Sequence, residues 1–182
     1  LSSKNKPRIV AFEPDTINFN TLEENIRLNG KDNVIAFNKA ISDKEGVLTL
    51  YLYKNYNPGR HSFIKQANSV GTAEVPIVPL DAFLQKEGFG DGPIKLIKID
   101  IEGYEYTALK AAIQTLERAK HILTEFSPYM MRDIGQEPMD YIKLLQSAGF
   151  KLQLIDEKGL SVPDFATIIN ENQQVNLFGS KS

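Results

Sequence analysis

Short apolar runs alternate with stretches of helical periodicity along most of this chain, and this alternation limits what it can fold into. We expect strands at Arg8–Phe12, Asn33–Phe37, Val47–Tyr53, Val75–Val78, Ile94–Ile101, His121–Phe126, Phe150–Ile155, Phe165–Ile169 and Val175–Phe178. We expect helices at Asp15–Leu28, Leu80–Lys86, Tyr104–Ala119 and Pro138–Ala148. The pattern predicts βαβ units in an α/β fold with a mainly parallel sheet, in which the last strands form an antiparallel edge.

The run from Lys98 to Glu105 is the most informative part of this pattern. The apolar strand Ile94–Ile101 is expected to be buried, and it leads into Asp100, Glu102 and Glu105. Ligands of open α/β sheets bind outside the carboxyl ends of the strands, so the run indicates an enzyme. We expect Asp100 to be functional, with Lys98 as an alternative structural partner. We expect Glu105 to be a solvated acid favoured by the dipole of the next helix.

Two further strands end in acids, Glu13 after Phe12 and Glu125 after Thr124. A parallel sheet would bring these acids and Asp100 to one edge. Glu13 has the chemistry to accept hydrogen bonds from the ribose hydroxyls of a nucleotide, and it also has the chemistry to favour a helix N-terminus. Asp100 and Glu125 are also candidate ligands for a magnesium ion. These alternatives stay open at the level of sequence.

One histidine, His61, lies in a polar loop element that runs from Gly59 to Phe63. Its ordinary pKa lies near neutrality, which suits a general base or a substrate contact, whereas a loop histidine can equally be solvated. The second histidine, His121, begins a strand and is expected to be structural.

Composition excludes several classes of function. The net charge of −2 gives no electrostatic reason to expect binding to nucleic acid or to an anionic membrane. No apolar run reaches the roughly 18 residues of a membrane-spanning helix. The absence of cysteine excludes disulfides, thiolate catalysis and cysteine-ligated zinc, and is compatible with the cytoplasmic location that we expect. The 182 residues fit a single domain over the whole chain, 1–182.

Five segments follow one another along nearly the whole chain, and they are Val10–Asp15, Asn38–Asp43, Pro79–Asp81, Ile97–Glu105 and Leu123–Glu125. In this order and spacing they resemble the FkbM-type methyltransferases. The Lys-Ile-Asp-Ile-Glu-Gly-x-Glu run is the most specific of them. The resemblance implies a Rossmann-like, seven-stranded fold that uses S-adenosylmethionine to methylate hydroxyl oxygens of small molecules or sugars.

The resemblance also implies roles for individual residues. Glu13 corresponds to the acid that binds the cofactor ribose, and Asn38 and Ala40 would lie near the adenine. Asp100 would lie beside the methionine end of the cofactor and the transferred methyl group, as first candidate for the base, with His61 second. Inserted strands at about 47–78 would carry Gly59, His61 and Ser62 toward this site.

One departure from the family pattern stands out. The family begins with a strand and a glycine-rich turn that hold the methionine part of the cofactor, and nothing similar precedes Arg8. We expect the parent protein to supply this first strand upstream of Leu1, which makes the chain a truncated domain. Two alternatives to the methyltransferase remain, a NAD-dependent oxidoreductase and a non-catalytic nucleotide-binding fragment. The sequence carries no signal for an oligomeric state.

Overall fold

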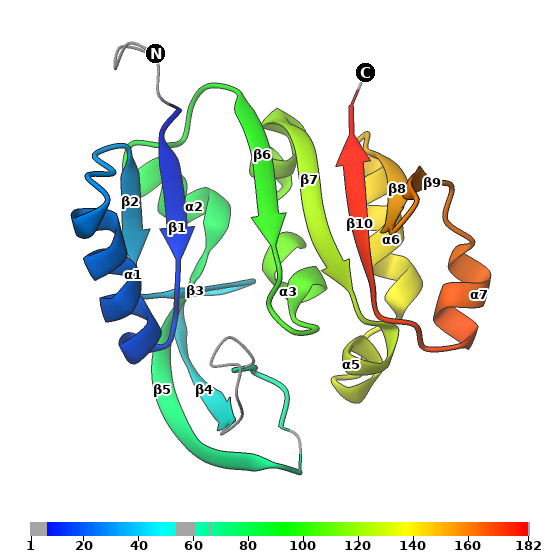
Figure 1. The fold of residues 1–182 in the computed structure, drawn as a ribbon, viewed down its shortest axis with the longest axis horizontal. Helices are drawn as coiled ribbons and strands as arrows, with labels where there is room; N and C mark the ends of the chain where they lie inside the picture. The colour runs from blue at the N-terminus through cyan, green and yellow to red at the C-terminus, as the bar shows by residue number, and fades with distance from the viewer. Residues whose placement is uncertain (1–6, 54–60, 66, 182) are drawn as a thin grey trace.

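The computed structural model describes residues 7–53, 61–65 and 67–181, and it is an α/β structure (Figure 1). The strands are β1 (Ile9–Phe12), β2 (Val34–Phe37), β3 (Ala40–Ser42), β4 (Gly46–Tyr53), β5 (Ser69–Pro79), β6 (Ile94–Ile99), β7 (Ala119–Phe126), β8 (Lys151–Asp156), β9 (Gly159–Ser161) and β10 (Val175–Ser180). The helices are α1 (Thr16–Leu28), α2 (Leu80–Lys86), α3 (Glu105–Leu109), α4 (Ile113–Arg118), α5 (Pro128–Asp133), α6 (Pro138–Ser147) and α7 (Phe165–Asn170). The predicted α/β class is therefore confirmed.

The described strands form three sheets. β1 and β2 pair in parallel, and β6 pairs in parallel with β7. The largest sheet has the order β6-β7-β10-β8-β9, in which β10 is antiparallel to both of its neighbours. The last strand is therefore antiparallel, as predicted, but it lies inside the sheet and β9 forms the edge. The third sheet has the order β3-β5-β4 and lies beyond the carboxyl ends of β1 and β6 (Figure 1).

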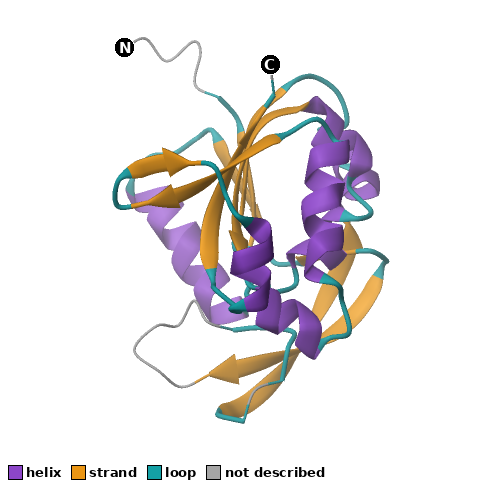
Figure 2. Cartoon of the chain, turned by 90° about the vertical axis from the view of Figure 1, so that its right-hand side faces the viewer, coloured by secondary structure: helices purple, strands orange, loops and turns teal. Residues whose placement is uncertain are grey.

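The main core lies on one face of the five-stranded sheet. Ile122 and Phe126 of β7 and Leu177 of β10 are completely buried there, against apolar side chains from α2 to α7. Figure 2 shows α1 on one side of the strands and the larger group of helices on the other. Along the described chain, no helix covers the opposite face of β6 and β7, where Leu96 and Lys98 point by strand alternation.

β6 differs from the buried strand predicted at Ile94–Ile101. It ends at Ile99, and Leu96 is 51% exposed. The physical reason is that β6 has one hydrogen-bonded neighbour and helices on one face only among the described residues. A strand at the centre of a doubly covered sheet would bury both faces.

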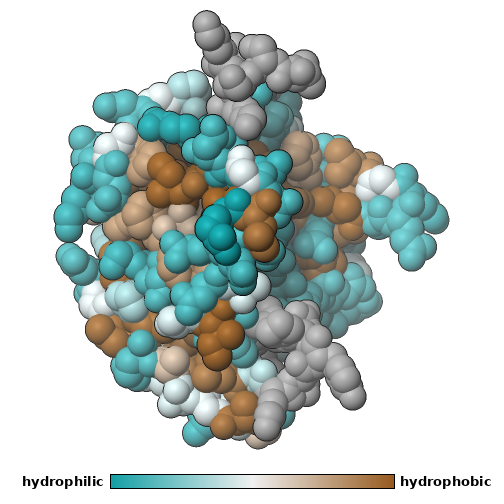
Figure 3. Space-filling model, turned by 60° about the vertical axis from the view of Figure 1, so that its left-hand side comes forward, coloured by the Kyte–Doolittle hydropathy of each residue, from teal (hydrophilic) through white to brown (hydrophobic). Residues whose placement is uncertain are grey.

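The helix α1 begins and ends as its sequence predicts, with the Asp15 carboxylate accepting a hydrogen bond from the N–H of Asn18 at its N-terminus. None of its residues is buried, and Ile17 is 76% exposed. Figure 3 shows apolar side chains reaching the surface on the side of the molecule that carries α1 and β2. This helix is thus only partly packed against the strands.

The single helix predicted at Tyr104–Ala119 is wrong. The segment forms two short helices, α3 and α4, that are separated at residues 110–112. The Asp81 carboxylate of α2 accepts hydrogen bonds from the N–H groups of Gln114 and Thr115 and from the Thr115 hydroxyl, at 2.6 to 2.9 Å. A side chain from α2 therefore caps the start of α4. The apolar periodicity of the sequence, taken alone, continues through residues 110–112 as a single helix.

The strand predicted at Phe165–Ile169 is also wrong, because this segment is helix α7. Asp164 accepts hydrogen bonds from the N–H and the hydroxyl of Thr167, which starts the helix. A short apolar run is compatible with a buried strand and with a buried helix. In this segment the N-terminal cap at Asp164 favours the helix.

β5 is longer than the strand predicted at Val75–Val78, although it contains Pro76. Pro76 pairs with Val47 of β4, and the pairing of β5 with β3 begins one residue later, at Ile77. The proline thus lies where β5 has one neighbour, so its missing N–H removes no bond to β3.

The turn that joins β6 to α3 has an unusual backbone. Glu102 has a φ of 55° and Gly103 a φ of 91°, which is the region that favours glycine. A Cβ at Gly103 would overlap the Cβ of Met130 and press on the side chain of Ile64. The turn is therefore packed between α5 and the segment that links β4 to β5.

None of the helices in the described part of the chain is long and apolar enough to cross a membrane.

The close packing of this turn gives a test. Gly103→Ala should lower the free energy of unfolding by about 1–3 kcal/mol more than Gly92→Ala, because the new methyl group has no space at residue 103. Gly92 is a matched control, since its φ is 89° and a Cβ there would meet nothing within 4 Å. Urea denaturation measures both variants. Equal losses would mean that the turn is not packed against Met130 and Ile64.

Candidate active site at the carboxyl edge of the strands

Four strands end at the same edge of the molecule. β1 and β2 run in parallel, as do β6 and β7, and Figure 1 shows the carboxyl ends of all four pointing the same way. Glu13 and Asn38 directly follow β1 and β2, Asp100 directly follows β6, and Glu125 lies at the end of β7. The structure therefore places the predicted strand-terminal acids at one edge.

Glu13 and Asn38 are joined by hydrogen bonds. The Asn38 side-chain amide donates to the carbonyls of Glu13 at 2.9 Å and Pro14 at 3.0 Å. The Glu13 carboxylate accepts from the N–H of Asp15 at 2.8 Å. Burial raises the pKa of Glu13, partly opposed by this N–H and assisted by the nearby Asp15 charge. The two residues hold the ends of β1 and β2 together, and Glu13 stays half-buried beside them.

Ala40 follows Asn38 by two residues and is a buried residue of β3 that pairs with Ile77 of β5. Its contact with an adenine stays a prediction.

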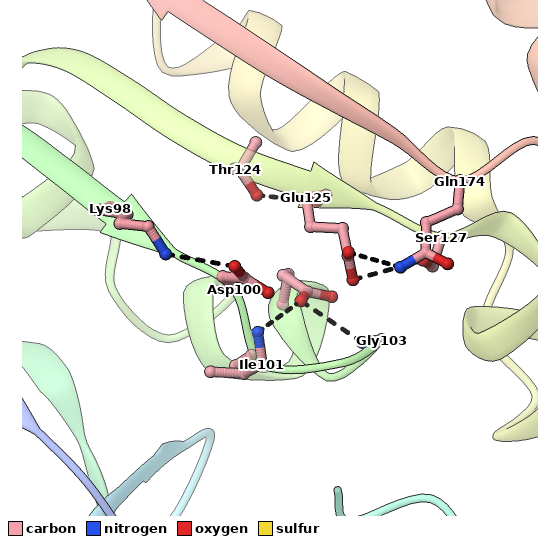
Figure 4. Close-up of polar contacts among 9 residues, drawn as sticks. Lys98, Asp100, Ile101, Gly103, Thr124, Glu125, Ser127 and Gln174 are labelled. Atoms are coloured by element: carbon pink, nitrogen blue, oxygen red, sulfur yellow. Dashed lines mark hydrogen bonds and ion pairs between the residues drawn. The ribbon is translucent and has the colours of Figure 1, made fainter. Parts of the chain in front are cut away.

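Asp100 is exposed at the end of β6 and pairs with Lys98, as Figure 4 shows. The distance between the Lys98 ammonium nitrogen and the Asp100 carboxylate oxygen is 3.2 Å. The two side chains are 62% and 46% exposed, so this ion pair contributes little free energy and can be exchanged for another partner. The Asp100 carboxylate is thus accessible to a bound molecule.

Glu105 contradicts its predicted role as a solvated acid. It is completely buried, and one of its carboxyl oxygens accepts hydrogen bonds from the N–H groups of Ile101 at 2.9 Å and Gly103 at 3.3 Å. Burial raises the pKa of Glu105 to about 7, with the nearby Glu125 charge acting in the same direction and the backbone N–H groups opposing it. The side chain turns back into the loop rather than out to solvent.

Glu125 is held by residues from two other segments. Its carboxylate accepts hydrogen bonds from the Ser127 hydroxyl and from the Gln174 amide, which precedes β10 (Figure 4). Among residues 7–53, 61–65 and 67–181, no group of three or more histidines or acids could hold a metal ion. A magnesium ion bound by Asp100 and Glu125 would therefore need further ligands.

His61 and Ser62 lie close to the β6–α3 turn. The Ser62 hydroxyl donates to the carbonyl of Glu102 at 3.1 Å, and the ring of Phe63 lies 5.1 Å from that of Tyr104. His61 is half-buried and its Nδ1 accepts a hydrogen bond from the N–H of Tyr53 at 3.2 Å. These contacts join Ser62 and Phe63 to the turn after Asp100. The approach of His61 to the site stays a prediction, and Gly59 lies outside the described residues.

The segment Asn38–Asp43 is connected to the same turn. The Tyr104 hydroxyl lies 3.4 Å from that of the buried Ser42, and the Lys110 ammonium pairs with Asp43 at 2.7 Å. The hydrogen bond from Lys110 lowers the pKa of Asp43. Glu105, Tyr104 and Ser42 thus support the site, although no sequence pattern predicted this role for them. One signal was available for Glu105, since its spacing from Gly103 suits a side chain that folds back onto a turn.

Comparisons with known proteins agree with the α/β fold. The family model described as "Methyltransferase FkbM domain" matches residues 2–152. A crystal structure of Methyltransferase FkbM from Methylobacillus flagellatus KT has a similar fold, with a TM-score of 0.54 and 17% sequence identity. The similarity covers 95% of this chain but 36% of that protein's chain. No curated protein matches the sequence. Because the family model covers most of the chain, this protein belongs to the FkbM methyltransferase domain family.

Proposed function

We propose that this domain takes part in transferring a methyl group from S-adenosylmethionine to a hydroxyl oxygen of a small molecule or sugar. The observation that carries the proposal is the placement of Glu13 and Asp100 directly after parallel strands whose carboxyl ends lie at one edge. Nucleotide cofactors of α/β folds bind at such edges. Membership of the FkbM family favours this chemistry over hydride transfer to NAD.

The residues after β1 and β2 fit the nucleoside part of the cofactor. Glu13 presents a half-buried carboxylate that accepts a hydrogen bond from the N–H of Asp15, and Asn38 donates to the backbone carbonyl of Glu13. Such a carboxylate can accept hydrogen bonds from two ribose hydroxyls. Ala40 and Asn38 are proposed to contact the adenine.

The residues after β6 fit the transfer step. When bound, S-adenosylmethionine supplies a methyl group whose bond to the sulfonium breaks as the acceptor oxygen takes it. Asp100 accepts the proton that the hydroxyl group releases, and Lys98 can give up its weak ion pair to allow this. Positioning of the two reactants supplies much of the remaining rate enhancement.

His61 fits a different role from that of the base. In the neutral ring, an Nδ1 that accepts from Tyr53 leaves the proton on Nε2. That nitrogen then donates a hydrogen bond and cannot remove a proton. We assign proton removal to Asp100, and to His61 a hydrogen bond to the acceptor molecule.

We also propose that the cofactor site is completed by one further strand. Figure 1 shows β1 and β6 as neighbours that run in the same direction, and no hydrogen bond of the described sheets joins them. Each has one paired edge, toward β2 and β7 respectively. A parallel strand with a glycine-rich turn, from polypeptide outside this sequence, would pair with both free edges and bring backbone N–H groups beside Asp100.

If a further strand pairs with β1 and β6, the amide groups of these two strands gain protection from hydrogen exchange. Extending the chain upstream to include such a segment should slow amide hydrogen exchange in β1 and β6 and strengthen binding of S-adenosylhomocysteine. β8 and β9 serve as the internal control, because they lie at the other end of the sheet. Unchanged exchange in β1 and β6 would contradict the pairing.

Glu13→Gln should weaken binding of S-adenosylhomocysteine about 10-fold, since hydrogen bonds from hydroxyls to a charged acceptor are worth about 1.5–3 kcal/mol. Glu23→Gln is the matched control, an exposed acid on α1. Isothermal calorimetry on the protein that carries the completing segment measures both. An unchanged dissociation constant for the Glu13 variant would remove Glu13 from the cofactor site.

Asp100→Asn should lower kcat by about 100-fold or more, the range of a lost general base, while S-adenosylhomocysteine still binds. Lys98→Met is the informative companion, because it removes the ion pair and leaves the base in place. Near-normal turnover by the Asp100 variant would exclude this carboxylate from the chemistry.

A further inference from the structure

Glu105 closes the turn between β6 and α3 from the inside. One carboxyl oxygen accepts the N–H groups of Ile101 and Gly103, so the side chain spans the loop that Asp100 begins. The other carboxyl oxygen is buried and makes no hydrogen bond with the described residues. One oxygen of the Glu105 carboxyl group thus accepts two hydrogen bonds, and the other oxygen accepts none from the described residues.

The turn needs this support because its backbone is strained. Glu102 lies at a positive φ, which is uncommon for any residue other than glycine. Such conformations persist where surrounding contacts hold them. Ser62 holds the Glu102 carbonyl from outside, and Glu105 holds the neighbouring N–H groups from inside.

We propose that Glu105 is a positioning residue for the methyl-transfer site and that it acts in its protonated form. One carboxyl oxygen fixes the turn and the proton stays on the other, so Glu105 adds no negative charge beside Asp100. This inference deepens the proposed function, because it says what aims the Asp100 carboxylate.

The surroundings of Glu105 favour the protonated form. The titratable groups that interact with it are Glu125 of β7 and Tyr141 of α6, and neither supplies a positive charge. A buried carboxylate that has one unpaired oxygen and no positive charge beside it costs far more free energy than the neutral acid at the same place. The pKa of about 7 agrees with this geometry.

The protonated form predicts a direction for the effect of pH on stability. Because burial raises the pKa of Glu105 in the folded protein, the stabilisation is complete below the ordinary glutamate pKa. It is lost as the pH rises through about 7, when a charge has to form in the interior. Glutamine keeps the accepting oxygen and stays neutral, so Glu105→Gln mimics the protonated state at every pH.

The first test compares thermal unfolding of the wild type, Glu105→Gln and Glu87→Gln between pH 5 and pH 8. The wild type should lose about 5 °C or more over this range and Glu105→Gln should lose much less. The control should follow the wild type, because Glu87 is an exposed acid. Equal slopes for the wild type and Glu105→Gln would overturn the assignment of the proton.

The second test separates positioning from mere stability. Glu105→Ala should speed amide exchange at Ile101 and Gly103 and lower kcat about 10-fold with KM for the cofactor unchanged, whereas Glu105→Gln restores both. If Glu105→Ala does not fold, Glu105→Asp replaces it, since its shorter side chain cannot reach both N–H groups. Normal kcat in the Ala or Asp variant, or no rescue by Gln, overturns the positioning role.

The two tests also distinguish failure of this inference from failure of the proposed function. Unfolding and amide exchange need no cofactor, so they report on Glu105 even if the wild type binds no S-adenosylhomocysteine. Absence of that binding in the wild type that carries the completing segment would count against the methyltransferase site alone.

Discussion

The parallel pairing of β1 with β2 and of β6 with β7 determines where the polar groups at the ends of these strands lie. Each pair of parallel strands ends at one edge, and Figure 1 shows that both pairs point the same way, so Glu13 and Asp100 come to the same side of the molecule. The loops that follow these strands then carry side chains to this edge. The hydrogen bonds of Asn38 hold the loop after β1, and those of Glu105 and Ser62 hold the turn after β6.

Much of this arrangement is predictable from the sequence, because apolar runs and their terminal acids carry it. The strand ends at Glu13 and Asp100 follow from runs of apolar residues that stop at polar ones. The helix that follows β1 is also predictable, since Asp15 lies at its N-terminus as the cap. At these strand ends and at the start of α1, the neighbouring residues in the sequence are sufficient to predict the structure.

Prediction from the sequence is wrong where a contact between residues far apart in sequence determines the local structure. Asp81 splits the expected helix after Tyr104 by capping α4 from another helix. Glu105 has the appearance of a first-turn acid, and only the packing around Gly103 shows that it is buried. The exposure of Leu96 depends on which elements flank β6, and no property of the strand's own residues reveals this.

The position of β10 has a consequence for how the domain is divided. β10 lies between β7 and β8, although it comes last in sequence, and Gln174 just before it contacts Glu125. The residues that match the family model end at 152, before β10 begins. A fragment cut at that boundary would leave β7 without a neighbour on one side and would lose the buried Leu177. The unit that folds therefore extends past the unit that the family model matches.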